Sequence, residues 1–340
     1  MVRRASVLGW IAVAAASLVL PSGAWAWGAT GHRLIGVVGA EALPPEIPAF
    51  LRSREAVQAV GELAREADRS KGVGDPHDAD LNPAHFVDVD DTGRGGGGGP
   101  SLDDLPPTRA AYAAALRAAG TDDYVQGYLP YSLMEGYQQL AKDFAYWRAE
   151  RWAEDHLKSR AERKWIGRDR RLRERLILRD LGYWAHFVGD ASQPLHVSMH
   201  FNGWGPFPNP QGFTQDKVHA PFEGAFVRQY VTAEDVSAHM RPYGACACTP
   251  QQRAGRYLRA TLAQTEPFYV LEKAGGFKDG DARGRTFAAD RLAAGASALR
   301  DMVVDAWTES AGLVVGYPAV SVADVLAGKV DPYDNLYGMD

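Results

Sequence analysis

The stretch YWAHFVGDASQPLH, residues 183–196, gathers three side chains that can bind a metal ion. His186 and Asp190 are four residues apart, so they project from the same face of a helix. Pro194 cannot continue that helix and is expected to end or kink it just before position 194. His196 then leaves in a new direction and can reach a second metal ion. From this stretch alone, a buried His–Asp hydrogen-bonded pair without metal is the alternative.

Helical patterns dominate the rest of the chain. Residues 172–183 are rich in Leu, Ile and Arg, which indicates an amphipathic helix leading into the quoted stretch. Alternation typical of strands is rare. We therefore predict an all-α fold. Further helices are expected over residues 33–43, 47–67, 108–117, 131–158, 217–232, 249–273 and 285–310, and Gly- and Pro-rich loops over 72–91 and 201–216.

The first 26 residues have the features of a secretion signal. Arg3 and Arg4 give a positive start, residues 7–20 form an apolar run, and AWA at 24–26 is a small-x-small cleavage site. The apolar run is shorter than the roughly 20 residues that a membrane span needs, and no later stretch is long and apolar enough. We expect a signal peptide over 1–26 and an exported protein, periplasmic or secreted, that begins at Trp27.

One domain is expected after the signal. The candidate metal ligands come from both ends of the region from Trp27 to Glu223, and ligands that must converge favour a single compact multi-helix domain, here residues 27–316. Residues 317–340 contain Pro318 and Pro332 and a polar end, which indicates a C-terminal tail. The formal net charge of −5 gives no overall attraction to nucleic acid or anionic lipid.

Three other segments have less definite roles. Residues 160–179 are rich in Arg, which is typical either of a phosphate-contacting face or of a solvated helix face, and the second is favoured. The glycine run over 95–99 is expected to be a flexible insert. Cys246 and Cys248 are too close in sequence for an unstrained disulfide and too few for a complete zinc site.

A second pair strengthens the case for metal. His219 and Glu223 repeat the His-x-x-x-carboxylate spacing of His186 and Asp190. Mixed imidazole and carboxylate ligands suit zinc. Once the signal is removed, Trp27 offers a free α-amine and its own carbonyl, which can chelate a metal ion beside His32.

Together these motifs resemble the superfamily of trinuclear zinc phosphoesterases. Its branches are the secreted single-strand-specific nucleases of fungi and plants, and the bacterial zinc-dependent phospholipases C. The similarity covers residues 27 to about 223. It rests on WGATGH (27–32), EAD (66–68), NPAHFVD (82–88), HFVGDASQPLH (186–196), and the pair His219 and Glu223.

The resemblance implies the all-α fold of this superfamily and three zinc ions per chain. One zinc would be held by Asp68, His85, His186 and Asp190, with Asp190 bridging to a second zinc bound by Trp27 and His32. The third would be held by His196, His219 and Glu223. Asp68 and Asp190 would thus belong to the catalytic metal pair, although Asp75, Asp78 and Asp80 lie near Asp68 in the sequence.

The chain departs from the nuclease branch in two places. Glu223 stands where the nucleases usually have Asp, as in the phospholipases, and FNGWG (201–205) replaces a Gly-Gly-Asn motif. The expected activity is endonucleolytic cleavage of RNA and single-stranded DNA. The alternatives are a phospholipase C acting on phospholipids, and a non-enzymatic exported protein with structural zinc. No protein partner can be inferred.

Overall fold

The computed structural model describes residues 27–337, and the predicted all-α class is confirmed. Within these residues the only strands are β1 (Val314–Val315) and β2 (Val320–Ser321), which pair antiparallel. The helices are α1 (Ala29–Glu41), α2 (Arg54–Leu63), α3 (His77–Leu81), α4 (Arg109–Ala118), α5 (Asp123–Gln126), α6 (Leu129–His156), α7 (Arg160–Asp190), α8 (Val227–Tyr230), α9 (Ala233–Ala238), α10 (Pro250–Leu262), α11 (Thr265–Lys273), α12 (Ala282–Ser310) and α13 (Val322–Leu326).

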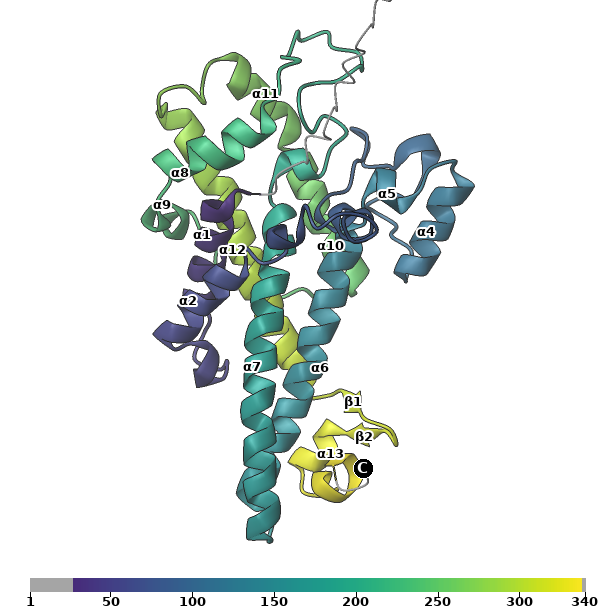
Figure 1. Ribbon diagram of the computed structural model, residues 1–340, viewed down its shortest axis with the longest axis vertical. Coiled ribbons are helices and arrows are strands. Elements are labelled where there is room, and N and C mark those ends of the chain that lie inside the picture. The colour runs from purple at the N-terminus through teal and green to yellow at the C-terminus, as the bar shows by residue number, and fades with distance from the viewer. Residues whose placement is uncertain (1–26, 338–340) are drawn as a thin grey trace, which may run out of the picture.

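Three long helices form the frame of the molecule. α6 and α7 pack side by side as a hairpin, and α12 packs against both of them. α1 lies against α12, α2 and α7, so it closes one side of the frame. In Figure 1 the hairpin of α6 and α7 extends downward, away from the cluster of helices around the upper half of α7.

The hairpin depends on a cap and a close helix contact. Ser159 caps α7, because its side chain accepts a hydrogen bond from the backbone N–H of Glu162. Further along, the Trp184 indole donates to the carbonyl of Leu133 over 3.1 Å. Gly136 allows this approach, since a Cβ there would clash with the Trp184 ring. The contact fixes the rotation of α7 and therefore the direction of the residues that follow Trp184.

The apolar core has two large parts that meet at the end of α7. One includes Val87, Phe187 and Val188, and the other includes Trp27, Ile35, Leu195 and Phe222. The candidate ligands are interleaved with these residues along the chain. The core therefore surrounds the predicted metal site.

Several predicted boundaries differ from the structure. The helix predicted over 47–67 is broken, because Ser53 caps a new helix and accepts from the Ala56 N–H. Residues 77–85, predicted as loop, form α3 and the 3₁₀-helix η3 (Asn82–His85). Within 217–232, residues Pro221–Phe226 form a π-helix, η6, before α8. The glycine run is not an open insert: Gly96 donates its N–H to the Gln126 side chain.

The prediction of a C-terminal tail from residue 317 is wrong for the segment up to 337. Val322 and Val325 of α13 are fully buried against α6, and Tyr333 and Tyr337 contact the Trp165 ring. The prolines and the polar end favour a tail, but these few apolar residues are enough to dock the segment. The predicted signal peptide, residues 1–26, lies outside the described residues.

Two further facts bear on the sequence predictions. The structure joins Cys246 and Cys248 in a disulfide. Among the helices described over 27–337, none combines the length and the apolar character that crossing a membrane requires.

Candidate metal centre

The last turn of α7 carries the first two candidate ligands. His186 and Asp190 are both fully buried, and His186 Nε2 lies 3.2 Å from Asp190 Oδ2. α7 ends at Asp190, three residues earlier than the proline predicted, and a short turn leads to Gln193, the cap of the 3₁₀-helix η5 (Pro194–His196). The chain reverses there, so His196 returns toward Asp190, and its Nδ1 lies 4.0 Å from Asp190 Oδ1.

A first cluster forms where α1 meets α7. His32, in the first turn of α1, stacks on His186 with ring centroids 3.8 Å apart. Its Nε2 atom lies 3.5 Å from Asp190 Oδ1. His32, His186 and Asp190 are all fully buried, and their ligand atoms lie within 4.8 Å of one another.

A second cluster adds Asp68 and His85 to His186. Asp68 Oδ1 lies 3.8 Å from His186 Nε2 and 4.0 Å from His85 Nε2. Of the four aspartates near this position in the sequence, Asp68 is the one that the fold directs at the histidines. Asp75 and Asp80 are exposed, and Asp78 accepts hydrogen bonds from its own loop, at the N–H groups of Gly72 and Gly74.

The third cluster contains His196, His219 and Glu223. Glu223 Oε2 lies 2.9 Å from His219 Nε2 and 3.7 Å from His196 Nε2. Gln193 also donates to this carboxylate over 3.3 Å. The residues come from η5 and from the turn that leads through η6. The π-helical turn is a local widening of the kind often found at functional sites.

Trp27 lies beside these clusters, but its side chain has a structural role. The buried indole donates to the Gly189 carbonyl and to the Ser192 hydroxyl, at 2.9 and 3.0 Å. The next residue, Gly28, donates its N–H to the Glu223 carbonyl. The start of the described chain is thus fixed against both α7 and η6.

Backbone carbonyls orient three of the imidazoles. The Nδ1 atoms of His186 and His196 donate to the carbonyls of Ala64 and His85, over 2.9 and 2.7 Å. The Nδ1 atom of His85 lies 3.1 Å from the Asn82 carbonyl. Because a carbonyl can only accept, each Nε2 keeps its lone pair and faces a cluster. Metal-binding histidines are oriented in this way.

Electrostatics favour the cation-binding form of some ligands and oppose that form in others. At His186, burial alone would lower the pKa, but the Asp190 carboxylate outweighs it and raises that pKa above its usual value. Burial lowers the pKa of both His85 and His219 to about 3, so each ring is neutral at neutral pH. Burial alone would raise the pKa of Asp190, but the neighbouring His186 and His196 outweigh it and hold that pKa below its usual range. Burial raises the pKa of Glu223 to about 8, and a bound cation would favour its ionised form.

The inward-facing atoms lack hydrogen-bond partners. They are Nε2 of His32, His85, His186 and His219, both carboxylate oxygens of Asp190 and Oε1 of Glu223. Buried polar atoms left unpaired cost about 1–3 kcal/mol each, so such a concentration needs a compensating ligand. The donor set and the burial fit metal ions, and the three buried clusters can hold them.

Lys71 is a nearby residue that the sequence argument missed. Its ammonium lies 2.6 Å from Asp68 Oδ1, and its charge helps to lower the pKa of His85. The sequence spacing indicates this contact, because Lys71 is three residues after Asp68 and side chains at that spacing meet across one helical turn. A cation from the protein itself therefore lies at the edge of the second cluster.

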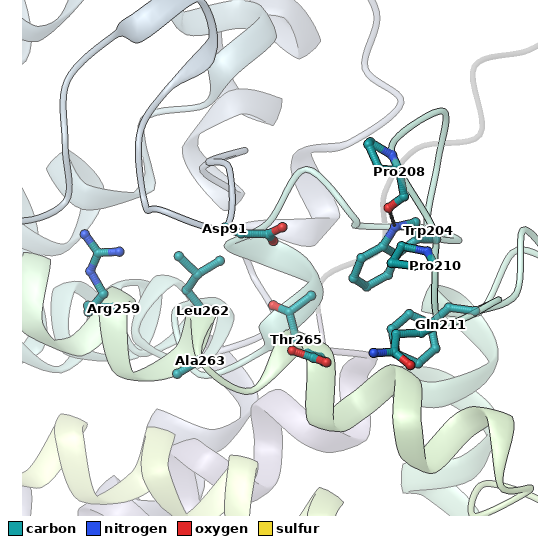
Figure 2. A pocket seen from close by; sticks show the side chains of 11 residues that line it. Asp91, Trp204, Pro208, Pro210, Gln211, Arg259, Leu262, Ala263 and Thr265 are labelled. Atoms are coloured by element: carbon teal, nitrogen blue, oxygen red, sulfur yellow. Dashed lines mark hydrogen bonds between the residues drawn. The ribbon is translucent and has the colours of Figure 1, made fainter.

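A pocket of about 500 Å³ was also missed, because loops far apart in sequence form it. Figure 2 shows Asp91 on one side, Trp204, Pro208 and Gln211 on another, and the junction of α10 and α11 below. His200, four residues after His196, positions two of the walls. Its ring stacks on Trp204 at 3.8 Å, and its Nε2 lies 3.3 Å from Asp91 Oδ1.

Comparison of the chain with protein-family models and with curated protein sequences finds no match. The resemblance to trinuclear zinc phosphoesterases therefore stays a prediction from the motifs. What the structure adds is geometric: it brings the eight predicted His, Asp and Glu side chains into three adjoining clusters.

Proposed function

We propose that this protein is an exported zinc-dependent phosphodiester hydrolase, and specifically an endonuclease that cuts RNA and single-stranded DNA. The observation that carries the proposal is the position of Asp190. One of its oxygens faces Nε2 of His186, and the other faces Nε2 of His32. A carboxylate approached by a different imidazole at each oxygen suits a bridge between two cations, whereas a structural zinc site needs only one closed set of four ligands.

The ligand types favour zinc over other common divalent ions. Four of the six side chains in the first and third clusters are imidazoles, and imidazole with carboxylate suits zinc, while calcium and magnesium prefer all-oxygen sites. Under the proposal, one zinc is held by Asp68, His85, His186 and Asp190, a second by His32, Asp190 and the Trp27 amine and carbonyl, and a third by His196, His219 and Glu223.

Zinc ions bound there would supply a hydroxide at neutral pH and offset negative charge on the phosphate. The protein groups have complementary tasks. Asp190 fixes the separation of the first two sites, and the carbonyls of Ala64 and His85 hold His186 and His196 in a single orientation. The Lys71 ammonium, at the edge of the second cluster, is placed to attract an anionic ester.

The large pocket supports a nucleic-acid substrate. Its walls include the aromatic side chains of Trp204 and Phe213 and the acceptors of Asp91, Gln211 and Glu266. Carboxylate and amide oxygens accept hydrogen bonds from the exocyclic amines of bases, and aromatic rings pack against base faces. A volume of about 500 Å³ suits a nucleobase better than a small ammonium head group.

A different cavity favours the second candidate, a phospholipase C. It has about 170 Å³ and lies between Phe222, Phe226, Phe268 and Phe277, with Lys217 and Lys278 among its lining residues. An apolar cavity of this kind could hold part of an acyl chain, and the two lysines could contact the lipid phosphate.

Parallel assays separate the candidates. The mature chain loaded with zinc is incubated with single-stranded DNA, with RNA and with phosphatidylcholine, and the products are identified. The nuclease proposal expects shorter oligonucleotides from both nucleic acids and an intact lipid. Release of phosphocholine with both nucleic acids intact would select the phospholipase. If no substrate is cleaved although zinc is bound, the metal is structural.

A further inference from the structure

The outer face of α7 over residues 160–179 has an unusual composition. This segment carries nine basic and three acidic side chains. None of the acidic ones is exposed, and every exposed residue of the segment is basic or apolar. A solvated helix face normally mixes both signs of charge. The outer side of this helix is therefore exposed, as the sequence predicted, but its exposed charges are all of one sign.

The basic residues of α7 fall into two sets. Toward α6, Arg170 pairs with Glu154 and Glu174, and Arg173 pairs with Asp143. The outer set recurs every three or four residues and consists of Lys164, Arg168, Arg171, Arg175 and Arg179. We call this set the cation row.

The cation row extends over about 23 Å at roughly 1.5 Å per residue. Arg179 pairs with the adjacent Asp180. The other four members make no ion pair with any residue of the described chain. These four positive charges are thus not neutralised by acidic side chains of the described chain.

An apolar strip borders the cation row. Leu172 and Leu176 are 54% and 51% exposed, and Trp165 is 37% exposed. At 3.6 residues per turn these three positions lie along the same side of the helix, beside the row, with Trp165 two turns before Leu172. The back of α7 packs on α6. Tyr333 and Tyr337 contact the Trp165 ring, while the cation row and both leucines of the strip are exposed.

Three occupants can be compared. A second copy of the chain would bring two rows of cations together, which repels. The phosphates of a nucleic acid would neutralise the charges of the cation row. They offer no apolar surface, however, against which the half-exposed leucines could be buried. An anionic bilayer satisfies both features, because its phosphates neutralise Arg and Lys while Leu and Trp enter the boundary between head groups and acyl chains.

We propose that the outer face of α7, the cation row with Trp165, Leu172 and Leu176, docks the protein on anionic lipid bilayers. This inference concerns the surface and does not rest on the proposed activity. The helix would lie parallel to the bilayer and would not cross it. Because the metal clusters are at the far, C-terminal end of α7, docking leaves their ligands untouched.

Vesicle flotation tests the proposal. The mature protein is mixed with vesicles of phosphatidylglycerol and phosphatidylcholine, or of phosphatidylcholine alone, at low salt. Binding is expected only to the first. The triple variant Arg168→Gln/Arg171→Gln/Arg175→Gln should bind on the order of 100-fold more weakly, and Leu172→Ser/Leu176→Ser at least about tenfold more weakly.

A scattered triple variant is the matched control. Arg54→Gln/Arg117→Gln/Arg228→Gln removes the same charge from exposed positions on other helices and should bind like the wild type. All variants should unfold at the wild-type temperature, which shows that they are folded. Vesicle binding is read without a cleavage assay, so failure of the proposed activity would not affect this test. Three results would each overturn the proposal: no vesicle binding, equal loss in the control, or full binding by the leucine variant. Retention of a single-stranded oligonucleotide by the cation row without vesicle binding would instead assign the face to nucleic acid.

Discussion

Oδ1 of Asp190, the last residue of α7, lies 3.5 Å from Nε2 of His32 in the first turn of α1. Both side chains are fully buried, so this approach exists only when α1 is packed against α7. Cations bound between these helices would therefore stabilise the folded chain as well as form the site. Metal content, stability and activity should change together when this relationship is disturbed.

Replacement of Asp190 tests the bridge. Asp190→Asn keeps the size of the side chain but removes the charge that would hold two cations close together. We expect loss of metal from the first two clusters and a fall in turnover of several orders of magnitude, measured by elemental analysis and a cleavage assay. Asp155→Asn, an exposed change on α6, is the control. Near-normal turnover of Asp190→Asn would exclude the bridging role.

Gly189, the residue before Asp190, allows a substitution that alters the position of a ligand without removing one. A Cβ on Gly189 would lie 3.0 Å from His32 Nδ1 and 3.1 Å from Ile35. His32 cannot move away easily, because it is buried and stacked on His186. Gly189→Ala should therefore lower metal binding at the cluster that contains His32 and spare the third cluster, although alanine favours the helix by about 1 kcal/mol.

Gly224→Ala is the matched control for this substitution. Gly224 follows the ligand Glu223, but a Cβ there meets no atom within 4 Å. Titration with zinc should show a lower stoichiometry only for Gly189→Ala. Equal zinc content in both variants would mean that the position of His32 does not matter for binding.

The sequence predicted the parts of the site that depend on local geometry. The four-residue spacing in a helix is enough to bring His186 to Asp190, and a proline after a helix is enough to turn His196 back. Other features depend on distant packing. The pocket forms only because Asp91, Trp204 and the α10–α11 junction lie together in the fold. No local sequence pattern predicts that these distant segments meet. The docking of residues 320–337 on α6 and on Trp165 of α7 likewise rests on a few apolar contacts, in a segment whose prolines and polar end favour a tail.

The start of the mature chain gives a further prediction. Under the proposal, the α-amine of Trp27 binds zinc, and such an amine has an unperturbed pKa of about 8, so zinc displaces its proton readily. One extra residue before Trp27 converts this amine into an amide. The extended chain should bind one zinc fewer and be nearly inactive. Equal zinc and equal turnover in both forms would leave Trp27 only its hydrogen bonds to Gly189 and Ser192.

A buried carboxyl far from the clusters should make stability depend on pH. Burial raises the pKa of Glu150 from 4.5 to about 8, against the opposing charge of Arg173. The folded chain thus holds this proton more tightly than the unfolded chain. The stabilisation is complete below about pH 4.5 and is lost as the pH rises toward 8.

Glu150→Gln isolates this effect, because the amide oxygen can still accept from Tyr337. Denaturant unfolding at several pH values between 5 and 8 should show a smaller decline of the free energy of unfolding with pH for the variant than for the wild type. Parallel declines would show that Glu150 is already ionised in the folded chain.

Anomalous diffraction at the zinc absorption edge is the sharpest test that three metal sites adjoin one another and that Asp190 bridges the first two. Crystals of the mature protein grown with zinc should give three strong peaks: between Asp68, His85, His186 and Asp190; beside His32, Asp190 and the Trp27 amine; and between His196, His219 and Glu223. Absence of peaks at these side chains, or a single four-coordinate site away from Asp190, would contradict the account.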